Sequence, residues 1–218
     1  MPAEKKQTYL LFKRIFDIIF AIILLIATLP ILLIIAILIK LEDPKGSVFF
    51  RQKRIGYKNK EFLLFKFRSM IIDQVKNGIE LTDTERMLKI GTIIRKFSFD
   101  ELPQIINILK GEMSLIGPRA LPTVYLPYYT EKELHRHDVK PGISGWAQVN
   151  GRNFLTWDEK FKLDLYYVNN ICFSLDFNIF FMTIFKIFIK KEVGVRGADV
   201  PDVSLYQIRE KRIEKVVI

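Results

Sequence analysis

Residues 18–39 read IIFAIILLIATLPILLIIAILI, a run of 22 residues with no charge and with Thr28 as its single polar side chain. About 20 apolar residues are enough for a helix to cross a bilayer. The run is too long for the apolar part of a signal peptide, and no small-residue cleavage site follows it. The sequence therefore predicts a membrane helix, and it excludes a multi-span transporter because no second run of this length exists.

Two features of this run favour a re-entrant helix that enters and leaves on one face of the membrane. Pro30 lies just past its centre, where it removes a backbone donor and favours a kink. Basic residues flank both ends, with Lys13 and Arg14 before the run and Lys40 and Lys45 after it. Because basic flanks prefer the cytoplasmic side, a single span must place one set unfavourably outside. A single transmembrane anchor stays the alternative, since spanning helices often contain proline.

The composition narrows the classes of protein and of partner. Hydrophobic residues make up 50% and aromatic residues 13% of the chain, which excludes disorder along its whole length. A single cysteine, Cys172, excludes a disulfide scaffold. The first 44 residues hold five basic and four acidic side chains, so nearly all of the net charge of +10 belongs to residues 45–218. A basic body beside an apolar helix indicates anionic lipids, phosphorylated substrates or nucleic acid as partners.

Residues 47–70 have the pattern of a β-hairpin. A turn signal at 56–60 separates two runs rich in aromatic and aliphatic residues. On the second run Lys66 and Arg68 share one face, because side chains alternate along a strand. The hairpin thus presents two cations in register, and a solvated basic strand end is the alternative interpretation.

A short helix is predicted over residues 102–110. Its apolar residues recur at the spacing of one helical face, and Gly111 suits the position just after a helix end. Asp100 is a natural N-cap for this helix, while in a second register Ser98 and Glu101 form a capping box.

The same helix start carries a group of charges that suits phosphoryl transfer. Asp100 and Glu101 are adjacent, and Arg95 precedes them by about one turn. The positive end of a helix keeps a carboxylate ionised and attracts phosphate. A nucleophilic acid and a nearby arginine would be the parts of such a site. The alternative is that both acids only cap the helix.

The remaining segments give weaker signals. Residues 71–92 are polar and are predicted to be partly helical. The turn at 114–119 exposes Arg119, and the loop at 141–153 gathers three glycines with Gln148 and Arg152. Glycine lets the backbone approach a ligand, and arginine supplies a fork of donors for phosphate.

Residues 158–176 are predicted to form an amphipathic helix followed by a connector, with Asp164 and Asp176 as ordinary surface acids. Residues 179–189 are too few to span a bilayer and fit either an interfacial helix or a buried one. His135 and His137 lack further metal ligands at the right spacing, so they are interpreted as surface residues.

Taken in order, these motifs resemble the bacterial sugar transferase family, the monotopic phosphoglycosyl transferases, over roughly residues 10–192. After the apolar segment with its central proline, the motifs are Phe49-Phe-Arg-Gln-Lys-Arg-Ile-Gly56, Lys66-Phe-Arg-Ser-Met70, Arg95 with Asp100-Glu-Leu-Pro-Gln104, Met113-Ser-Leu-Ile-Gly-Pro-Arg119, Pro141-Gly-Ile-Ser-Gly-Trp-Ala-Gln-Val-Asn-Gly-Arg152, and Tyr167-Val-Asn-Asn with Ser174-Leu-Asp176. No single motif is decisive, but all of them follow the family order.

The resemblance implies a reaction and a cofactor. Members of this family move a sugar 1-phosphate from a UDP-sugar to a polyprenyl phosphate, usually undecaprenyl phosphate, and release UMP. This is the first membrane step in assembling capsule, O-antigen or another bacterial glycan. The family uses an Asp–Glu pair and Mg²⁺. Asp100 matches the aspartate that forms a covalent phosphosugar intermediate, and it is also the predicted metal ligand. Glu101 matches its partner, a base or a group that orients the lipid phosphate.

The predicted phosphate- and substrate-binding residues follow from the matched motifs. They are Lys66, Arg68, Arg95, Arg119, Gln148 and Arg152. The chain departs from the family pattern in two places. Thr28 precedes Pro30 by two residues where the family often has serine directly before the proline, and Ala120 replaces the second proline of a Pro-Arg-Pro turn.

The sequence thus predicts an α+β protein that is mainly helical, with a re-entrant membrane helix at 1–44, a cytoplasmic catalytic domain at 45–191 and a tail at 192–218. Its predicted place is the cytoplasmic face of the inner membrane. The predicted partners are a UDP-sugar, undecaprenyl phosphate and membrane lipids, without nucleic acid, and a homodimer stays open. Two alternatives remain, a single-span protein with a basic nucleic-acid-binding body and a membrane scaffold without catalysis.

Overall fold

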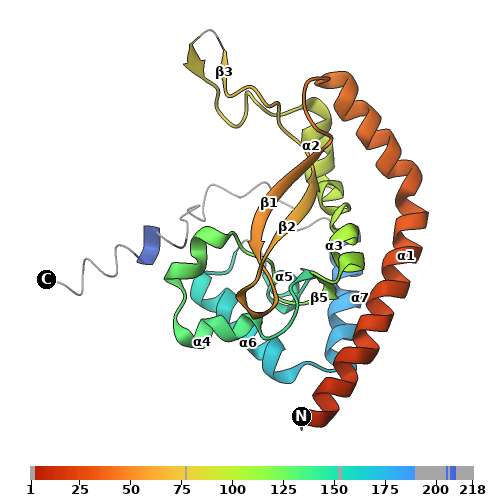
Figure 1. Ribbon diagram of the computed structural model, residues 1–218, viewed down its shortest axis with the longest axis vertical. Coiled ribbons are helices and arrows are strands. Elements are labelled where there is room, and N and C mark those ends of the chain that lie inside the picture. Colours follow the sequence, from red (N-terminus) through yellow and green to blue (C-terminus); the bar gives the residue numbers. More distant parts are fainter. Residues whose placement is uncertain (1–2, 77, 152–153, 190–204, 206, 210–218) are drawn as a thin grey trace, which may run out of the picture.

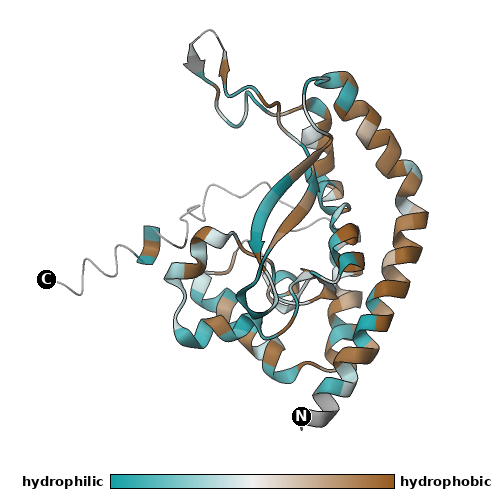
Figure 2. Cartoon of the chain, in the orientation of Figure 1, coloured by the Kyte–Doolittle hydropathy of each residue, from teal (hydrophilic) through white to brown (hydrophobic). Residues whose placement is uncertain are grey.

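One long helix, α1 (Ala3–Glu42), runs along the whole side of the molecule (Figure 1). The computed structural model describes residues 3–76, 78–151, 154–189, 205 and 207–209. With 40 residues, α1 is about 60 Å long, twice the thickness of a bilayer core. It continues through Pro30 without a break, and it is the one described helix long and apolar enough to cross a membrane. Most of its side chains are apolar (Figure 2).

The two ends of α1 are both bound to the polar body. Near the N-terminus, Arg14 donates to the carbonyl of Ile108 at 2.6 Å, and Asp17 accepts from the amide of Leu115 at 3.1 Å. At the C-terminus, the Glu42 carboxylate accepts from the amides of Lys89 and Ile90. Between these ends one face of α1 is buried against the body. Its buried apolar residues are Ala21, Ile35 and Ile39.

The predicted hairpin is confirmed. Strands β1 (Phe49–Ile55) and β2 (Glu61–Phe67) pair antiparallel around the turn η1 (Tyr57–Asn59). Phe62 and Leu64 of β2 pack into a core with Ala21 of α1. The hairpin therefore lies against the same body that α1 covers.

An arm leaves the end of β2 and projects from the molecule (Figure 1). It carries two short antiparallel strands, β3 (Val75–Lys76) and β4 (Ile79–Glu80), and returns to α2 (Lys89–Lys96). The helix predicted within residues 71–92 begins only at Lys89. There α2 packs directly on the exit of β2, because Gly91 has no Cβ, which would lie 2.1 Å from the carbonyl oxygen of Ser69.

The centre of the body is built from short elements. The 3₁₀ turn η2 (Phe99–Glu101) leads into α3 (Gln104–Lys110). Gly111 ends α3 with φ of +83°, as the sequence predicts. Strand β5 (Ser114–Ile116) then pairs in parallel with β6 (Gly142–Ser144). A Cβ on Gly142 would lie 2.1 Å from the Gly117 nitrogen, so this close approach requires glycine.

The rest of the body is helical. Its elements are η3 (Thr123–Tyr128), α4 (Glu131–Leu134), η4 (His135–His137), α5 (Trp146–Val149), α6 (Trp157–Asn170) and α7 (Phe173–Ile189). Helix α6 confirms the amphipathic helix predicted at this place, and α7 extends the apolar segment to 17 residues. Helices make up 59% of the structure, which confirms the mainly helical class.

Three residues interpreted as surface residues are buried, so that interpretation is wrong. Asp164 and Asp176 have exposed fractions of 3% and 7%, and His137 has 4%. Asp176 accepts hydrogen bonds from Tyr9 and Lys13 of α1, which explains its burial. This acid therefore fastens the start of α1 to α7. His135, by contrast, is exposed as predicted.

Candidate active site

Asp100 and Glu101 lie in the 3₁₀ turn η2 rather than at the start of a regular helix. Pro103 is the N-cap of α3, Asp100 does not cap it, and Ser98 makes no side-chain cap hydrogen bond. Both capping predictions are therefore wrong. Since capping does not explain the two carboxylates, their role depends on the charges around them.

Glu101 is held by two cations. Its Oε1 lies 2.9 Å from Lys66 Nζ and 2.7 Å from Arg119 Nη2. Burial alone would raise the pKa of Glu101, but the charges and hydrogen bonds of Arg119 and Lys66 outweigh burial and hold it well below its ordinary value. Glu101 therefore stays ionised and is a weak base.

Asp100 has a different environment from its neighbour. Its Oδ2 lies 3.7 Å from Lys66 Nζ, and in the described part of the chain no hydrogen bond holds its carboxylate. Burial raises its pKa against the opposing charge of Lys66, and the adjacent Glu101 adds to the rise. The side chain is 14% exposed. Asp100 thus has the carboxylate oxygens that are free to meet a substrate.

Lys66 reaches the pair because α3 fixes the edge of β2. The fully buried Asn107 of α3 accepts from the amide of Phe65 at 3.0 Å and donates to the carbonyl of Leu63 at 2.7 Å. The Asn107 side chain thus satisfies the backbone groups that β2 would otherwise offer to another strand. These bonds fix the backbone directly before Lys66 and so fix the direction of its side chain.

Arg95 lies at the end of α2, where its Nε donates to Ser69 Oγ at 2.9 Å. Its charge is close enough to lower the pKa of Asp100. The close packing of Gly91 on Ser69 brings this arginine to the pair. Arg95 therefore belongs to the same cluster as Lys66 and Arg119.

Arg119 is anchored through its backbone, while its side chain stays 42% exposed. The segment before it is fixed by the hydrogen bond from Gly142 N to Pro118 O at 3.0 Å. Its own carbonyl accepts from Nη2 of the buried Arg136 at 2.8 Å. A fixed backbone with an exposed guanidinium suits the recognition of an anion from solution.

The structure does not bring all the predicted binding residues together. Arg68 is buried at the end of β2, where it pairs with Asp43 and donates to the carbonyl of Ser47. Gln148 of α5 donates to the carbonyl of Ile143 at 3.0 Å. Arg152 lies outside the described residues. Phosphate binding by Arg68, Gln148 and Arg152 stays a prediction, and the internal contacts of Arg68 do not favour it.

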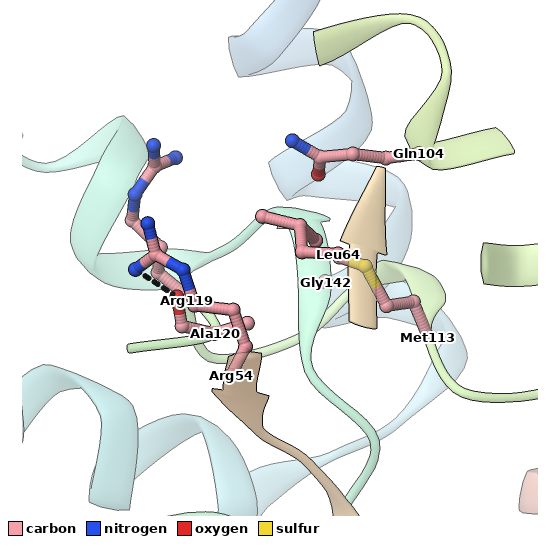
Figure 3. A pocket seen from close by; sticks show the side chains of 7 residues that line it. All are labelled: Arg54, Leu64, Gln104, Met113, Arg119, Ala120 and Gly142. Atoms are coloured by element: carbon pink, nitrogen blue, oxygen red, sulfur yellow. Dashed lines mark hydrogen bonds between the residues drawn. The ribbon is translucent and has the colours of Figure 1, made fainter. Parts of the chain in front are cut away.

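Two residues beside the pair were not among the predicted site residues. A small cavity is lined by Arg54, Leu64, Gln104, Met113, Arg119, Ala120 and Gly142 (Figure 3). Gln104 is 4% exposed, and its amide faces this cavity. Both Arg54 and Gln104 occur in motifs of the family resemblance, which is the one sequence signal that marks them.

The carboxylates suit a divalent cation shared with a substrate. Among the described residues, no group of three or more Asp, Glu, His or Cys side chains is placed to hold a metal ion. Mg²⁺ is commonly bound by one or two carboxylates together with substrate phosphates. Asp100, which lacks a hydrogen-bond partner in the described chain, fits that use, whereas Glu101 is already held by Lys66 and Arg119.

Comparison with known proteins gives consistent matches. A family model described as bacterial sugar transferase matches residues 8–190. The chain is 48% identical over 185 residues to the uncharacterized sugar transferase EpsL of Bacillus subtilis (strain 168), and the match covers 84% of this chain and 91% of EpsL.

Two further relatives have names that state a reaction. One is the UDP-N-acetylgalactosamine-undecaprenyl-phosphate N-acetylgalactosaminephosphotransferase of Aeromonas hydrophila, which is 42% identical over 81% of this chain and 43% of that protein. The other is the UDP-glucose:undecaprenyl-phosphate glucose-1-phosphate transferase of Escherichia coli (strain K12), which is 39% identical over 83% of this chain and 41% of that protein. The chain thus spans about two-fifths of the length of these two relatives.

Proposed function

Because the chain belongs to the bacterial sugar transferase family, we propose that it transfers a sugar 1-phosphate from a UDP-sugar to undecaprenyl phosphate and releases UMP. The observation that carries the mechanism is the difference between two adjacent acids. Glu101 is fixed by two cations, whereas Asp100 keeps its carboxylate free beside them. One acid organises the positive charge, and the other is available to react.

In the first step an Asp100 carboxylate oxygen attacks the β-phosphorus of the donor. A new P–O bond to Asp100 forms, the bond to the α-phosphate bridging oxygen breaks, and its electron pair leaves with UMP. Lys66 and Arg119 lie beside the pair and retain N–H donors beyond those that Glu101 accepts, so they are placed to hold the transferred phosphoryl oxygens.

In the second step an oxygen of the lipid phosphate attacks the same phosphorus, and the Asp100 carboxylate is released unchanged. The lipid phosphate is already an anion, so little general-base help is needed. This suits Glu101, whose lowered pKa makes it a poor proton acceptor. Of the two roles predicted for Glu101, the orienting role is the one that we propose.

Mg²⁺ would supply charge neutralisation for the donor diphosphate, held by Asp100 and the phosphate oxygens. A proposal for the whole reaction is tested directly with the protein in nanodiscs, Mg²⁺, undecaprenyl phosphate and a panel of UDP-sugars. Lipid-dependent release of UMP with one donor is expected. Without the lipid, UMP release should stop near one equivalent per protein, because the intermediate then accumulates.

The charges around Asp100 predict a pH dependence. Asp100 must be ionised to attack, so activity is lost as the pH falls through its raised pKa. Replacing Lys66 with glutamine removes the largest influence that lowers this pKa. The acid limb of single-turnover UMP release should therefore move to higher pH, with a rate about 10- to 100-fold lower at neutral pH.

The matched control is Lys60→Gln, which removes an exposed lysine from the hairpin turn. This variant should leave both the acid limb and the rate of single-turnover UMP release unchanged. An acid limb that stays in place in Lys66→Gln, or moves to lower pH, would contradict the role assigned to Lys66.

We also propose that α1 lies in one face of the membrane and does not span it. The support is that both ends of α1 bind the same polar body, through Arg14 at one end and Glu42 at the other. A spanning helix would separate its ends by the hydrocarbon core of about 30 Å. Because α1 continues through Pro30, we propose that it stays on one face of the membrane by a bend or tilt and not by a break.

Helix α7 offers a second apolar surface to the membrane. Ile179 is fully buried on its inner face. Its outer face carries four phenylalanines at helical spacing, each at least 51% exposed. They are Phe173, Phe177, Phe181 and Phe185. An exposed apolar stripe on a polar body is typical of an interfacial helix, so we propose that α7 rests in the bilayer surface.

Topology is tested with two introduced cysteines in a Cys172→Ser background. Gln7→Cys and Lys45→Cys place exposed thiols on opposite ends of α1. Both should resist an impermeant thiol reagent in intact cells and react after permeabilisation. A spanning helix would instead leave one of the two thiols open to labelling from outside.

A further inference from the structure

Arg54 is a partly buried cation that makes no ion pair within the described chain. It lies near the end of β1, where Nη1 donates to the carbonyl of Ala120 at 3.1 Å and Nη2 donates to Gln52 Oε1 at 2.6 Å. Both acceptors are neutral. Its Nε is buried without a hydrogen-bond partner, and no carboxylate of the described chain lies within ion-pair distance.

A second arginine lies beside it. Arg54 and Arg119 line the same cavity, with their guanidinium groups on one side and the Gln104 amide on the other (Figure 3). Burial and the charge of Arg119 lower the pKa of Arg54 to about 10, which still leaves it charged at neutral pH. Two like charges kept together at a partly buried site cost free energy unless an anion joins them.

Arg119 alone cannot balance a diphosphate. One of its N–H groups already binds Glu101 at 2.7 Å, so part of its charge is compensated inside the protein. Arg54 has no ion pair of its own, and the charge of Glu101 only partly opposes the lowering of its pKa. The second cation that a nucleoside diphosphate sugar requires is therefore present in the cavity wall, beside Arg119.

We propose that Arg54 binds the donor phosphate that leaves with the nucleotide, while Arg119 lies between this phosphate and the one that Asp100 attacks. The proposal rests on the proposed function. Arg119 contacts Glu101 directly, whereas Arg54 donates to the Ala120 carbonyl and makes no ion pair with either acid. Besides burial, the charges of Lys66, Glu101, Arg95 and Arg119 act on the pKa of Asp100. The order from Asp100 to Arg119 to Arg54 matches the order of attacked phosphate, bridging oxygen and leaving phosphate.

The test measures binding of UMP, UDP and uridine to the full chain in nanodiscs. Arg54→Gln removes the charge but keeps an amide donor for the Ala120 carbonyl. It should weaken UMP and UDP binding about 10- to 100-fold and leave uridine binding unchanged. Arg54→Lys keeps the charge but loses the forked N–H donors of the guanidinium, so its affinity for UMP and UDP should lie between those of the wild type and Arg54→Gln.

Arg51→Gln is the matched control, because Arg51 is on the same strand, is exposed and packs over the Phe65 ring. Its affinity for UMP should stay within about twofold of the wild type. A purely structural role for Arg54 would lower the unfolding temperature of Arg54→Gln and weaken the binding of uridine together with that of UMP. Unchanged uridine binding with weakened UMP binding is therefore the expected pair of results.

The outcomes separate this inference from the function on which it rests. If the wild type neither binds UDP nor releases UMP, the proposed function fails. If the wild type does both and Arg54→Gln binds UMP equally well, the role of Arg54 is overturned. Thermal unfolding of each variant is measured in parallel. If Arg54→Gln does not fold, UMP binding is measured with Arg54→Lys instead. An unchanged UMP affinity in Arg54→Lys would overturn the role of Arg54.

Discussion

Replacement of Asp100 with asparagine is expected to reduce turnover about 10⁴-fold or more, because an amide cannot form the acyl phosphate bond to the sugar phosphate. The change keeps the size of the side chain. Burial disfavours the charged form of Asp100, and Lys66 keeps Glu101 as its closer partner at 2.9 Å, so a neutral amide should cost little stability. The variant should therefore fold and still bind the donor.

The measurement uses a UDP-sugar with a radioactive β-phosphate and no lipid acceptor. The wild type should retain label after denaturation, and the labelled peptide should contain Asp100. Asp100→Asn should retain none. Asp83→Asn is the matched control, since Asp83 lies in the projecting arm with a side chain that is 84% exposed. A label that persists in Asp100→Asn, or maps to another residue, would refute the covalent mechanism.

Arg68 shows the limit of a prediction from the alternation of side chains along one strand. Alternation along the strand correctly places Lys66, because β2 continues to Phe67. It does not reveal that the side chain of Arg68, one residue past the end of β2, is buried against Asp43 just beyond α1. The Asp43 that pairs with Arg68 is 25 residues earlier. The pattern of one strand does not contain that contact.

The acids and arginines of the site also differ in how far the sequence predicts them. The motif order of the family marks Asp100, Glu101 and Arg119, and the structure places them in one cluster with Lys66. Composition and spacing do not show which arginines lie beside the acids, so they do not mark Arg54. Its position depends on the hydrogen bond from Ile55 N to Leu121 O, a contact between segments 66 residues apart.

The pair of Arg136 and Asp164 is expected to carry the largest stability effect in the body. Their side chains are 1% and 4% exposed, and Arg136 Nη2 lies 2.6 Å from Asp164 Oδ2. Removing one partner leaves a buried charge uncompensated, which costs about 3–5 kcal/mol. Asp164→Leu and Arg136→Met should each lower the free energy of unfolding by that amount, measured by urea denaturation in detergent.

The double variant distinguishes a stabilising pair from a positioning one. Two apolar residues of similar volume can replace a buried ion pair with little loss, so Arg136→Met/Asp164→Leu should lose much less stability than the two single changes combined. Its activity should nevertheless stay low, because the Arg119 carbonyl has lost the hydrogen bond from Arg136. Recovery of both stability and activity would show that Arg136 does not position Arg119.

An exposed pair provides the scale for this comparison. Lys53 and Glu61 form a diagonal ion pair across the hairpin, with 69% and 52% of their side chains exposed and with Lys53 Nζ 3.4 Å from Glu61 Oε2. Lys53→Met should change the free energy of unfolding by less than about 1 kcal/mol. The contrast follows from solvation, since water compensates the remaining charge of the hairpin but does not reach Asp164. Burial, rather than the short distance between the charges, is therefore what makes the loss of either Arg136 or Asp164 so costly.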